Sequence, residues 1–179
     1  AVAPAFALPA PLQAALSLPA GEQPAFHRFT VGEAKITVVS DGHFNMPVTE
    51  LGVNADPAQV AEFLAARLMP TDTAYRHTNH MFIELGDAKV LVDVGSGSRF
   101  VNTVGMLMEN LDAAGIDPDE ITHVFLTHAH PDHIWGIRDD FDEPIFPDAT
   151  YFIGGKEIDY WLQDDLVNKV VPEEQEIVL

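Results

Sequence analysis

The sequence predicts a mixed α/β fold or a layered α+β sandwich, because apolar runs typical of strands alternate with segments of helical periodicity. Apolar residues make up 47% of the 179 residues, which is enough for one domain with a buried core. The formal net charge of −19 disfavours nucleic acid as a partner. The chain has no cysteine, so any metal ion must be held by nitrogen and oxygen atoms.

Residues 1–25 are rich in alanine and proline and carry no charge before Glu22. This composition indicates an extension, either the remnant of an export signal or a plain linker. The first reading predicts a periplasmic or secreted protein and the second a cytoplasmic one. We expect the folded domain over residues 26–179.

Three apolar stretches in the first part of the chain predict strands. Residues 27–42 alternate apolar and polar side chains around Ile36 and Val38, and Asp41-Gly42 is expected to close this strand in a turn. Residues 80–95 predict a hairpin of two apolar strands around Gly86-Asp87.

Two segments have helical periodicity. In residues 54–70, Asp56 is the expected N-cap and Pro57 the first helical residue, with the helix ending before Pro70. Residues 98–115 predict a second helix that ends at Gly115. The expected inward-facing residues are Val60, Leu64 and Leu68 in the first helix and Val104, Leu107, Met108 and Leu111 in the second.

The second part of the chain continues the alternation. Residues 121–128, "ITHVFLTH", predict a short strand buried on both faces. Residues 148–155 predict another strand, and residues 156–170 predict a helix.

The stretch "THAHPDHIWG", residues 127–136, places four metal-ligand side chains within six positions. His128 and His130 are two residues apart in extended chain, so both side chains can reach one ion. Pro131 bends the chain, and Asp132 and His133 can then reach a second ion nearby. Imidazole and carboxylate groups suit zinc, manganese or iron, and this register is rare by chance. The cluster predicts a metal site at the end of a strand.

The segment "HAHPDH" resembles the H-x-H-x-D-H signature of the metallo-β-lactamase superfamily. "SDG" at 40–42, "VLVDVG" at 90–95 and "DYWL" at 159–162 agree with it in order and spacing. The pattern over residues 26–170 is most similar to the branch of methyl parathion hydrolase and, more distantly, the N-acyl homoserine lactone lactonases. The resemblance implies an αββα sandwich, of which this chain would hold the first half.

The resemblance also implies roles for individual residues. His128 and His130 would bind the first metal ion, and Asp132, the candidate catalytic residue, would bind the second together with His133. Asp93 would orient ligands from outside the coordination shell, and a strand-end turn residue is the alternative interpretation. The expected cofactor is a pair of divalent ions, zinc first, with manganese, cobalt or iron as alternatives. Such a pair activates water for attack on a carbonyl carbon or phosphorus.

Three further residues are candidates for a substrate pocket. Phe100 and Trp161 fall where the organophosphate-hydrolysing branch has aromatic walls, and His43 follows "SDG" on a loop expected to border the site. Core positions for the aromatics and a surface position for the histidine are the competing interpretations. His77, His80 and His123 are assigned no metal role. Gly136 is expected to let the chain pass close to the metals.

The family completes its site with a further histidine, a bridging aspartate and a last histidine, whereas no histidine follows His133 here. Four ligands cannot hold two ions, since each needs three or more. We therefore expect the N-terminal portion of a longer protein, missing the C-terminal half of the fold, and, by family resemblance, a homodimer.

The leading functional hypothesis is a dinuclear metal-dependent hydrolase of small neutral esters, phosphotriesters of the methyl parathion kind, or lactones. Alternatives are a β-lactamase of subclass B3, an iron-bearing redox relative, and a non-catalytic half-domain that requires a partner. A half-domain would expose one uncovered sheet face. No nucleic-acid partner is expected.

Overall fold

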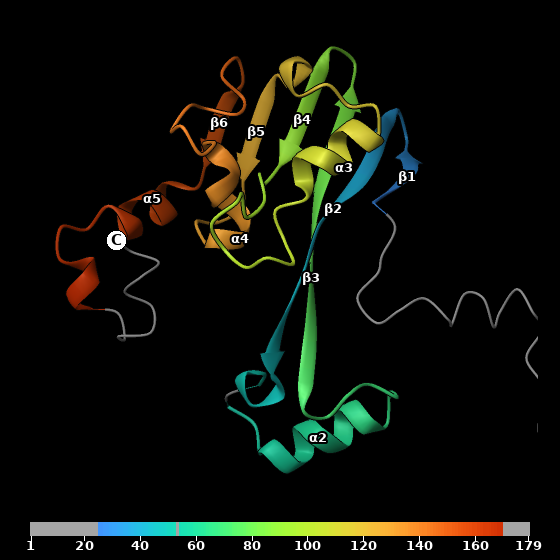
Figure 1. Cartoon of the computed structure of the whole chain (residues 1–179), viewed down its shortest axis with the longest axis vertical. Coiled ribbons are helices and arrows are strands. Elements are labelled where there is room, and N and C mark those ends of the chain that lie inside the picture. The colour runs from blue at the N-terminus through green and yellow to red at the C-terminus, as the bar shows by residue number, and fades with distance from the viewer. Residues whose placement is uncertain (1–24, 53, 170–179) are drawn as a thin grey trace, which may run out of the picture.

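The computed structural model describes residues 25–52 and 54–169, so the predicted tail lies almost wholly outside the described residues. Its centre is one six-stranded mixed sheet with the strands in chain order, β1 to β6 (Figure 1). The first four strands are antiparallel neighbours, and β4, β5 and β6 run parallel. The strands are β1 Phe26–Val31, β2 Ala34–Pro47, β3 Thr73–Leu85, β4 Ala88–Val92, β5 His123–Leu126 and β6 Thr150–Ile153.

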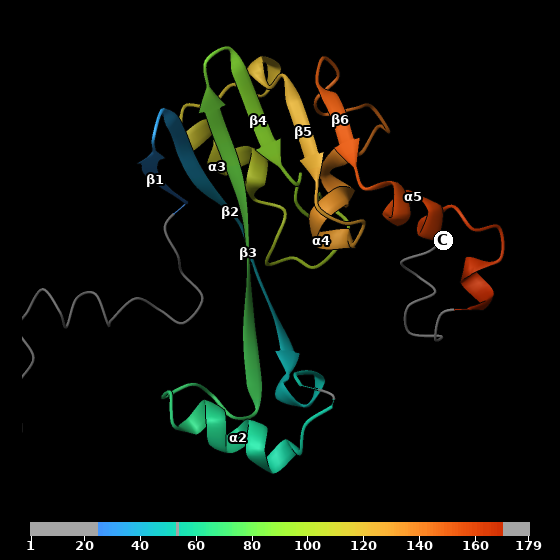
Figure 2. The ribbon, with the colours of Figure 1, turned by 180° about the vertical axis from the view of Figure 1, so that it is seen from behind.

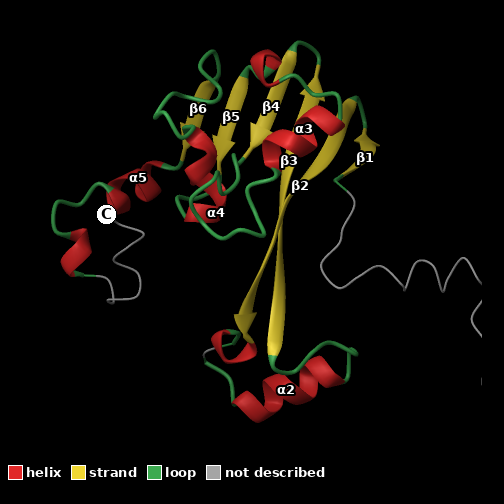
Figure 3. Cartoon of the chain, in the orientation of Figure 1, coloured by secondary structure: helices red, strands yellow, loops and turns green. Residues whose placement is uncertain are grey.

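The described residues also contain four short α-helices (Figure 3). They are α2 Pro57–Ala65, α3 Leu107–Ala113, α4 Pro131–Ile134 and α5 Gly155–Trp161. Single 3-10 turns occur at Val48–Glu50, Pro118–Glu120, Trp135–Ile137 and Leu166–Asn168. In the described part of the chain, no helix has the length and apolar character needed to cross a membrane.

The first predicted strand is in fact a hairpin of two strands, β1 and β2, and the second of these is long. The chain reverses at Gly32-Glu33, between β1 and β2, and β2 then continues through Asp41-Gly42 to Pro47. The predicted turn at Asp41-Gly42 is therefore wrong. Gly42 has φ +115°, and the β2–β3 register shifts between Ser40 and Gly42. A bulge at this point bends the strand without reversing it.

Beyond the bulge, β2 and β3 leave the sheet as a two-stranded ribbon with α2 at its tip (Figures 1 and 2). Helix α2 begins as predicted, with Pro57 first and the Asp56 side chain accepting a hydrogen bond from the Ala58 N–H at 2.8 Å. It ends at Ala65, and Leu68 follows with a left-handed φ of +57°. Leu64 is buried but Leu68 is 96% exposed, so the predicted inward position of Leu68 is wrong.

The predicted hairpin around Gly86-Asp87 is confirmed by β3 and β4. The predicted helix over residues 98–115 is confirmed only over α3, where Leu107 and Leu111 are buried and Gly115 follows with φ +66°. Residues 98–106 form a loop instead. The helix starts where the Asp41 carboxylate accepts a hydrogen bond from the Leu107 N–H at 2.9 Å, a tertiary contact that no local pattern reveals.

The two faces of the sheet differ in cover. Helix α3 lies in front of the sheet in Figure 1 and behind it in Figure 2, and on this side the core contains Val39, Phe82, Leu91, Leu111 and Val124. The opposite face carries a row of apolar side chains across five strands, which we call the apolar row. Register places in it Val38, Met81, Val92, Phe125 and Phe152.

Met81, Phe125 and Phe152 in the apolar row are all more than one-third exposed. The expectation that β5 is buried on both faces is therefore wrong, because no described element covers this side of the sheet. The uncovered face expected of a half-domain is present among the described residues.

Candidate metal centre

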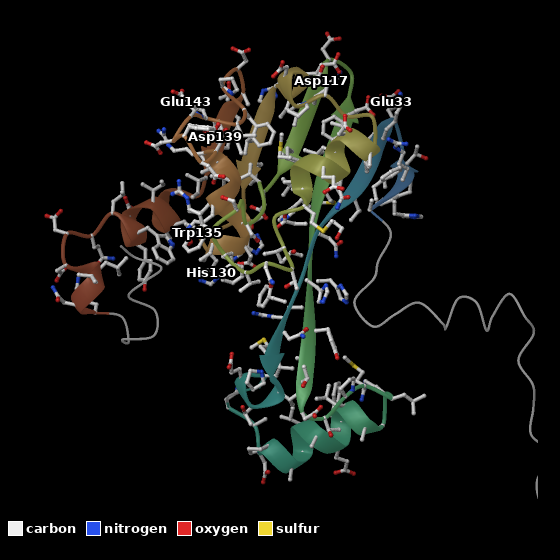
Figure 4. All side chains as sticks on the ribbon, viewed as in Figure 1. Glu33, Asp117, His130, Trp135, Asp139 and Glu143 are labelled. Atoms are coloured by element: carbon white, nitrogen blue, oxygen red, sulfur yellow. The ribbon has the colours of Figure 1, made fainter. Side chains whose placement is uncertain are left out.

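The four ligand-type residues of the motif, here called the loop cluster, lie together where β5 ends (Figure 4, near the labelled His130). The ring centroid of His128 is 4.5 Å from that of His130 and 4.0 Å from that of His133. Asp132 follows Pro131 into α4, and its Oδ2 is 3.4 Å from Nε2 of His133. The structure thus brings His128, His130, Asp132 and His133 together at one edge of the sheet.

Asp93 contacts the loop cluster directly. Its Oδ2 is 2.8 Å from Nδ1 of His133, and its two oxygens accept hydrogen bonds from the Thr127 N–H and hydroxyl at 2.7 and 2.8 Å. The buried Asp93 has φ +61°, a left-handed conformation that aspartate tolerates better than most residues. With Nδ1 of His133 facing Asp93, Nε2 is the nitrogen left to face a ligand.

Electrostatics follow from these contacts. Burial opposes the charge on His133, but hydrogen bonds to Asp132 and Asp93 outweigh it and raise the pKa of His133 to about 9. Burial likewise works against ionisation of Asp93 and Asp132, yet the bonds from His133 hold the pKa of each carboxyl below its usual value. Burial and the neighbouring histidines lower the pKa of His128. The carboxylates are therefore charged at neutral pH.

Glu157 of α5 holds the backbone of the loop cluster by a hydrogen bond, a role that sequence analysis missed. Its Oε1 accepts hydrogen bonds from the Ala129 N–H at 2.8 Å and from Nε1 of Trp161 at 2.7 Å. The bond from Ala129 is the main reason why the pKa of Glu157 is lowered. Nothing local marks this glutamate, since it lies 28 residues beyond its backbone partner.

Gly136 allows the loop cluster to approach the end of β4. A Cβ at this position would lie 1.9 Å from the Val94 carbonyl oxygen. The Gly136 N–H also donates to the Gly95 carbonyl at 3.0 Å, and the Val94 N–H donates to His133 O at 2.9 Å. The close approach expected at Gly136 is therefore one between backbones.

The loop cluster forms one wall of a cavity of about 320 Å³. The opposite wall belongs to the base of the ribbon and is formed by Phe44 of β2 and residues 76–80 of β3. Five of the eight histidines of the chain line this cavity, including His77 and His80, for which the sequence predicted no metal role. A hollow of about 440 Å³ near Arg28 and Glu120 contains no histidine.

The three predicted pocket residues lie around the cavity without lining it. Phe100 makes edge-to-face contacts with Phe44 and Trp135, at centroid distances of 5.3 and 6.0 Å. Trp161 lies edge to face with His130 at 6.1 Å. His43 pairs across the ribbon with His77 at 5.6 Å.

The donor chemistry of the loop cluster fits a divalent metal ion. All its donors are imidazole nitrogens or carboxylate oxygens, and Asp93 orients one ring. As they stand, no three His, Asp or Glu side chains within residues 25–52 and 54–169 converge to hold an ion. Two imidazoles on one zinc ion have centroids about 5–6 Å apart, given Zn–N bonds of about 2.0–2.1 Å. Binding would therefore require rings of the cluster to turn outward.

A comparison with protein families matches residues 74–147 to the metallo-beta-lactamase superfamily. The matched segment contains Asp93, the loop cluster and residues 76–80 of the ribbon wall. Over this segment the chain is similar to the metallo-β-lactamase superfamily. A curated relative, the lactamase-like protein adaB of Aspergillus niger, is 37% identical over 62 residues, which is 35% of this chain and 18% of that protein.

Solved structures show the same fold. The dizinc quorum-quenching lactonase AidC is 25% identical with a TM-score of 0.74, covering 86% of this chain and 57% of its own. The hydrolase AbOPH of the beta lactamase superfamily is 29% identical with a TM-score of 0.77, covering 87% and 53%. An N-acyl homoserine lactone lactonase at 16% identity has a TM-score of 0.54, covering 78% and 52%. The chain has the metallo-β-lactamase fold and spans about half the length of these neighbours.

Proposed function

We propose that this protein is a metal-dependent hydrolase that acts on small esters, phosphotriesters or lactones. The observation that carries the proposal is the loop cluster, in which four ligand-type residues meet at a strand end with His133 held by Asp93. The similarity of the chain to AidC, a lactonase, and to AbOPH, a hydrolase, supports the same class of reaction. The cavity of about 320 Å³ is large enough for a small substrate.

In this proposal His128 and His130 hold one divalent ion, and Asp132 and His133 hold a second, with zinc the first choice. Two such ions, when bound, activate water and polarise the oxygen of the group under attack. Asp132 is ionised at neutral pH and can accept a hydrogen bond from the attacking water. Asp93 keeps Nδ1 of His133 engaged, so that its Nε2 points to the cavity.

The ribbon supplies the substrate side of the proposed site. Phe44 offers an apolar surface, with Phe100 and Trp135 packed behind it. Trp161 adds an aromatic edge beside His130. Such walls suit an acyl chain or an aryl leaving group.

The proposal includes a covering element for the apolar row. Contiguous exposed apolar side chains, as in the apolar row, mark interfaces. We propose that this cover, from a further part of the protein or from a partner chain, also supplies the remaining metal ligands. The loop cluster alone would then bind metal without completing the reaction.

The test combines metal binding with hydrolysis. We expect the metal-free chain to take up zinc, and His128→Ala with His130→Ala to abolish tight uptake of the first ion and any hydrolysis of aryl esters, phosphotriesters or lactones. His27→Ala, which removes an imidazole on β1 outside the cavity, is the matched control. Zinc uptake that is equal in the double variant and the control would refute the proposal. Zinc uptake without turnover of any ester is the result expected of the loop cluster without its covering element.

A further inference from the structure

His80 of β3 is a buried histidine that the proposed centre does not yet use. Its side chain is 2% exposed, and among the described residues neither ring nitrogen has a hydrogen-bond partner. Buried polar groups are almost always paired, because an unpaired one destabilises the fold. An orphaned imidazole therefore indicates a ligand that binds there.

The position of His80 identifies the kind of ligand. It pairs in register with Val39, on the covered side of the sheet, and it lines the cavity opposite the loop cluster. Its ring lies edge to face with that of His133, with centroids 6.1 Å apart and planes at 87°. The unused nitrogens thus adjoin the His133 side of the loop cluster.

We infer that His80 is a nitrogen ligand for a divalent metal ion held with Asp132 and His133. This inference rests on the proposed function, because it assigns a third donor to the second of the two ions. Asp132 and His133 supply two donors, and an ion needs three or more. The centroid separation of 6.1 Å is close to the upper end of the about 5–6 Å expected for two imidazoles on one zinc ion.

The experiment measures metal binding and not turnover. The metal-free chain and its variants are titrated with Zn²⁺ against a competing chelator, and with Co²⁺, whose visible absorption reports the ligand set. His80→Phe removes both nitrogens, whereas His80→Gln keeps a hydrogen-bonding amide that is a poor metal ligand. His123→Gln on β5, outside the cavity, is the matched control.

We expect both His80 variants to bind one ion at least about tenfold more weakly, with an altered Co²⁺ spectrum, while the control behaves as the parent chain. We also expect metal-free His80→Phe to melt at a higher temperature than the parent, because an unpaired buried polar group is gone.

Two results would overturn the assignment of His80 as a ligand while leaving the proposed function standing. One is parent-like affinity and spectrum in both variants. The other is parent-like affinity in His80→Gln alone, which would show a hydrogen-bonding role. A parent chain that takes up no metal would refute the proposed function as well.

Discussion

The loop wall of the cavity, residues 128–133, and the ribbon wall, residues 76–80, both present histidines, but they hold them differently. In the loop wall, His133 is fixed by Asp93 and the neighbouring backbone by Glu157. In the ribbon wall, His80 is buried without a hydrogen-bond partner among the described residues. In the loop wall, His133 and the nearby backbone are thus held by hydrogen bonds before any ligand arrives, whereas the ribbon wall is placed only by strand register. The comparison indicates that the loop wall is held by the protein itself, whereas His80 would gain a partner only when a metal ion binds.

Gly136→Ala should have the largest effect, since it breaks the fixed position of the loop wall. The new Cβ would meet the Val94 carbonyl oxygen at 1.9 Å, so the chain must shift. We expect the free energy of unfolding to fall by about 2 kcal/mol or more, as for overpacked interiors. Denaturant unfolding measures this loss.

Gly155→Ala is the matched control for that change. Nothing lies within 4 Å of a Cβ at Gly155, which is the first residue of α5. We expect its stability to be unchanged or slightly raised. Equal losses in the two variants would show that the close contact at Gly136 does not fix the loop wall.

Asp93→Asn should have the next largest effect, and it tests whether orientation distinguishes the loop wall. Asparagine tolerates the left-handed φ of +61°, so the substitution removes the charge and leaves the backbone in place. We expect metal affinity to fall by about 10–100-fold, as for other carboxylates that support metal-binding histidines. Chelator competition measures the affinity, with Asp87→Asn in the β3–β4 turn as control. An unchanged affinity would mean that Asp93 is only a turn residue.

Metal binding by the loop wall should also depend on pH. With the pKa of His133 at about 9 in the metal-free protein, a proton must leave before a metal ion can bind its Nε2. Apparent metal affinity should therefore rise by about tenfold per pH unit between pH 7 and 9. Calorimetry in two buffers of different ionisation enthalpy counts the released protons. Asp93→Asn should narrow the pH range over which the affinity rises, because Asp93 helps to raise the pKa of His133. An affinity that does not change with pH would contradict the elevated pKa.

The same pKa has a consequence for stability. Because the folded-state pKa of His133 lies above its ordinary value of about 6.5, the ion pairs with Asp93 and Asp132 stabilise the metal-free fold fully below pH 6.5. That contribution is lost as the pH rises through 9. Thermal unfolding of the metal-free protein at pH 6 and pH 10 measures it.

Local patterns were informative where neighbours in sequence are neighbours in space. The start of α2 at Asp56-Pro57 and the hairpin at Gly86-Asp87 depend on a few adjacent residues, and both were predicted. Asp41-Gly42 was misjudged because a turn and a bulge use the same residue types. Leu68 was misjudged because periodicity did not show that α2 ends at Ala65, so that Leu68 follows the helix with a left-handed φ and is exposed.

The sequence by itself determined the resemblance to the superfamily and the position of the loop cluster, because HAHPDH places its donors within six positions of one strand end. The resemblance also implied a supporting role for Asp93, but only the tertiary structure showed its contact with His133 and identified Glu157 and His80. Asp93 reaches His133 across 40 positions, Glu157 reaches Ala129 across 28, and His80 arrives from a strand on the other side of the cavity. These pairs are set by strand order and register, which follow from burial of the whole sheet and leave no local trace at either residue.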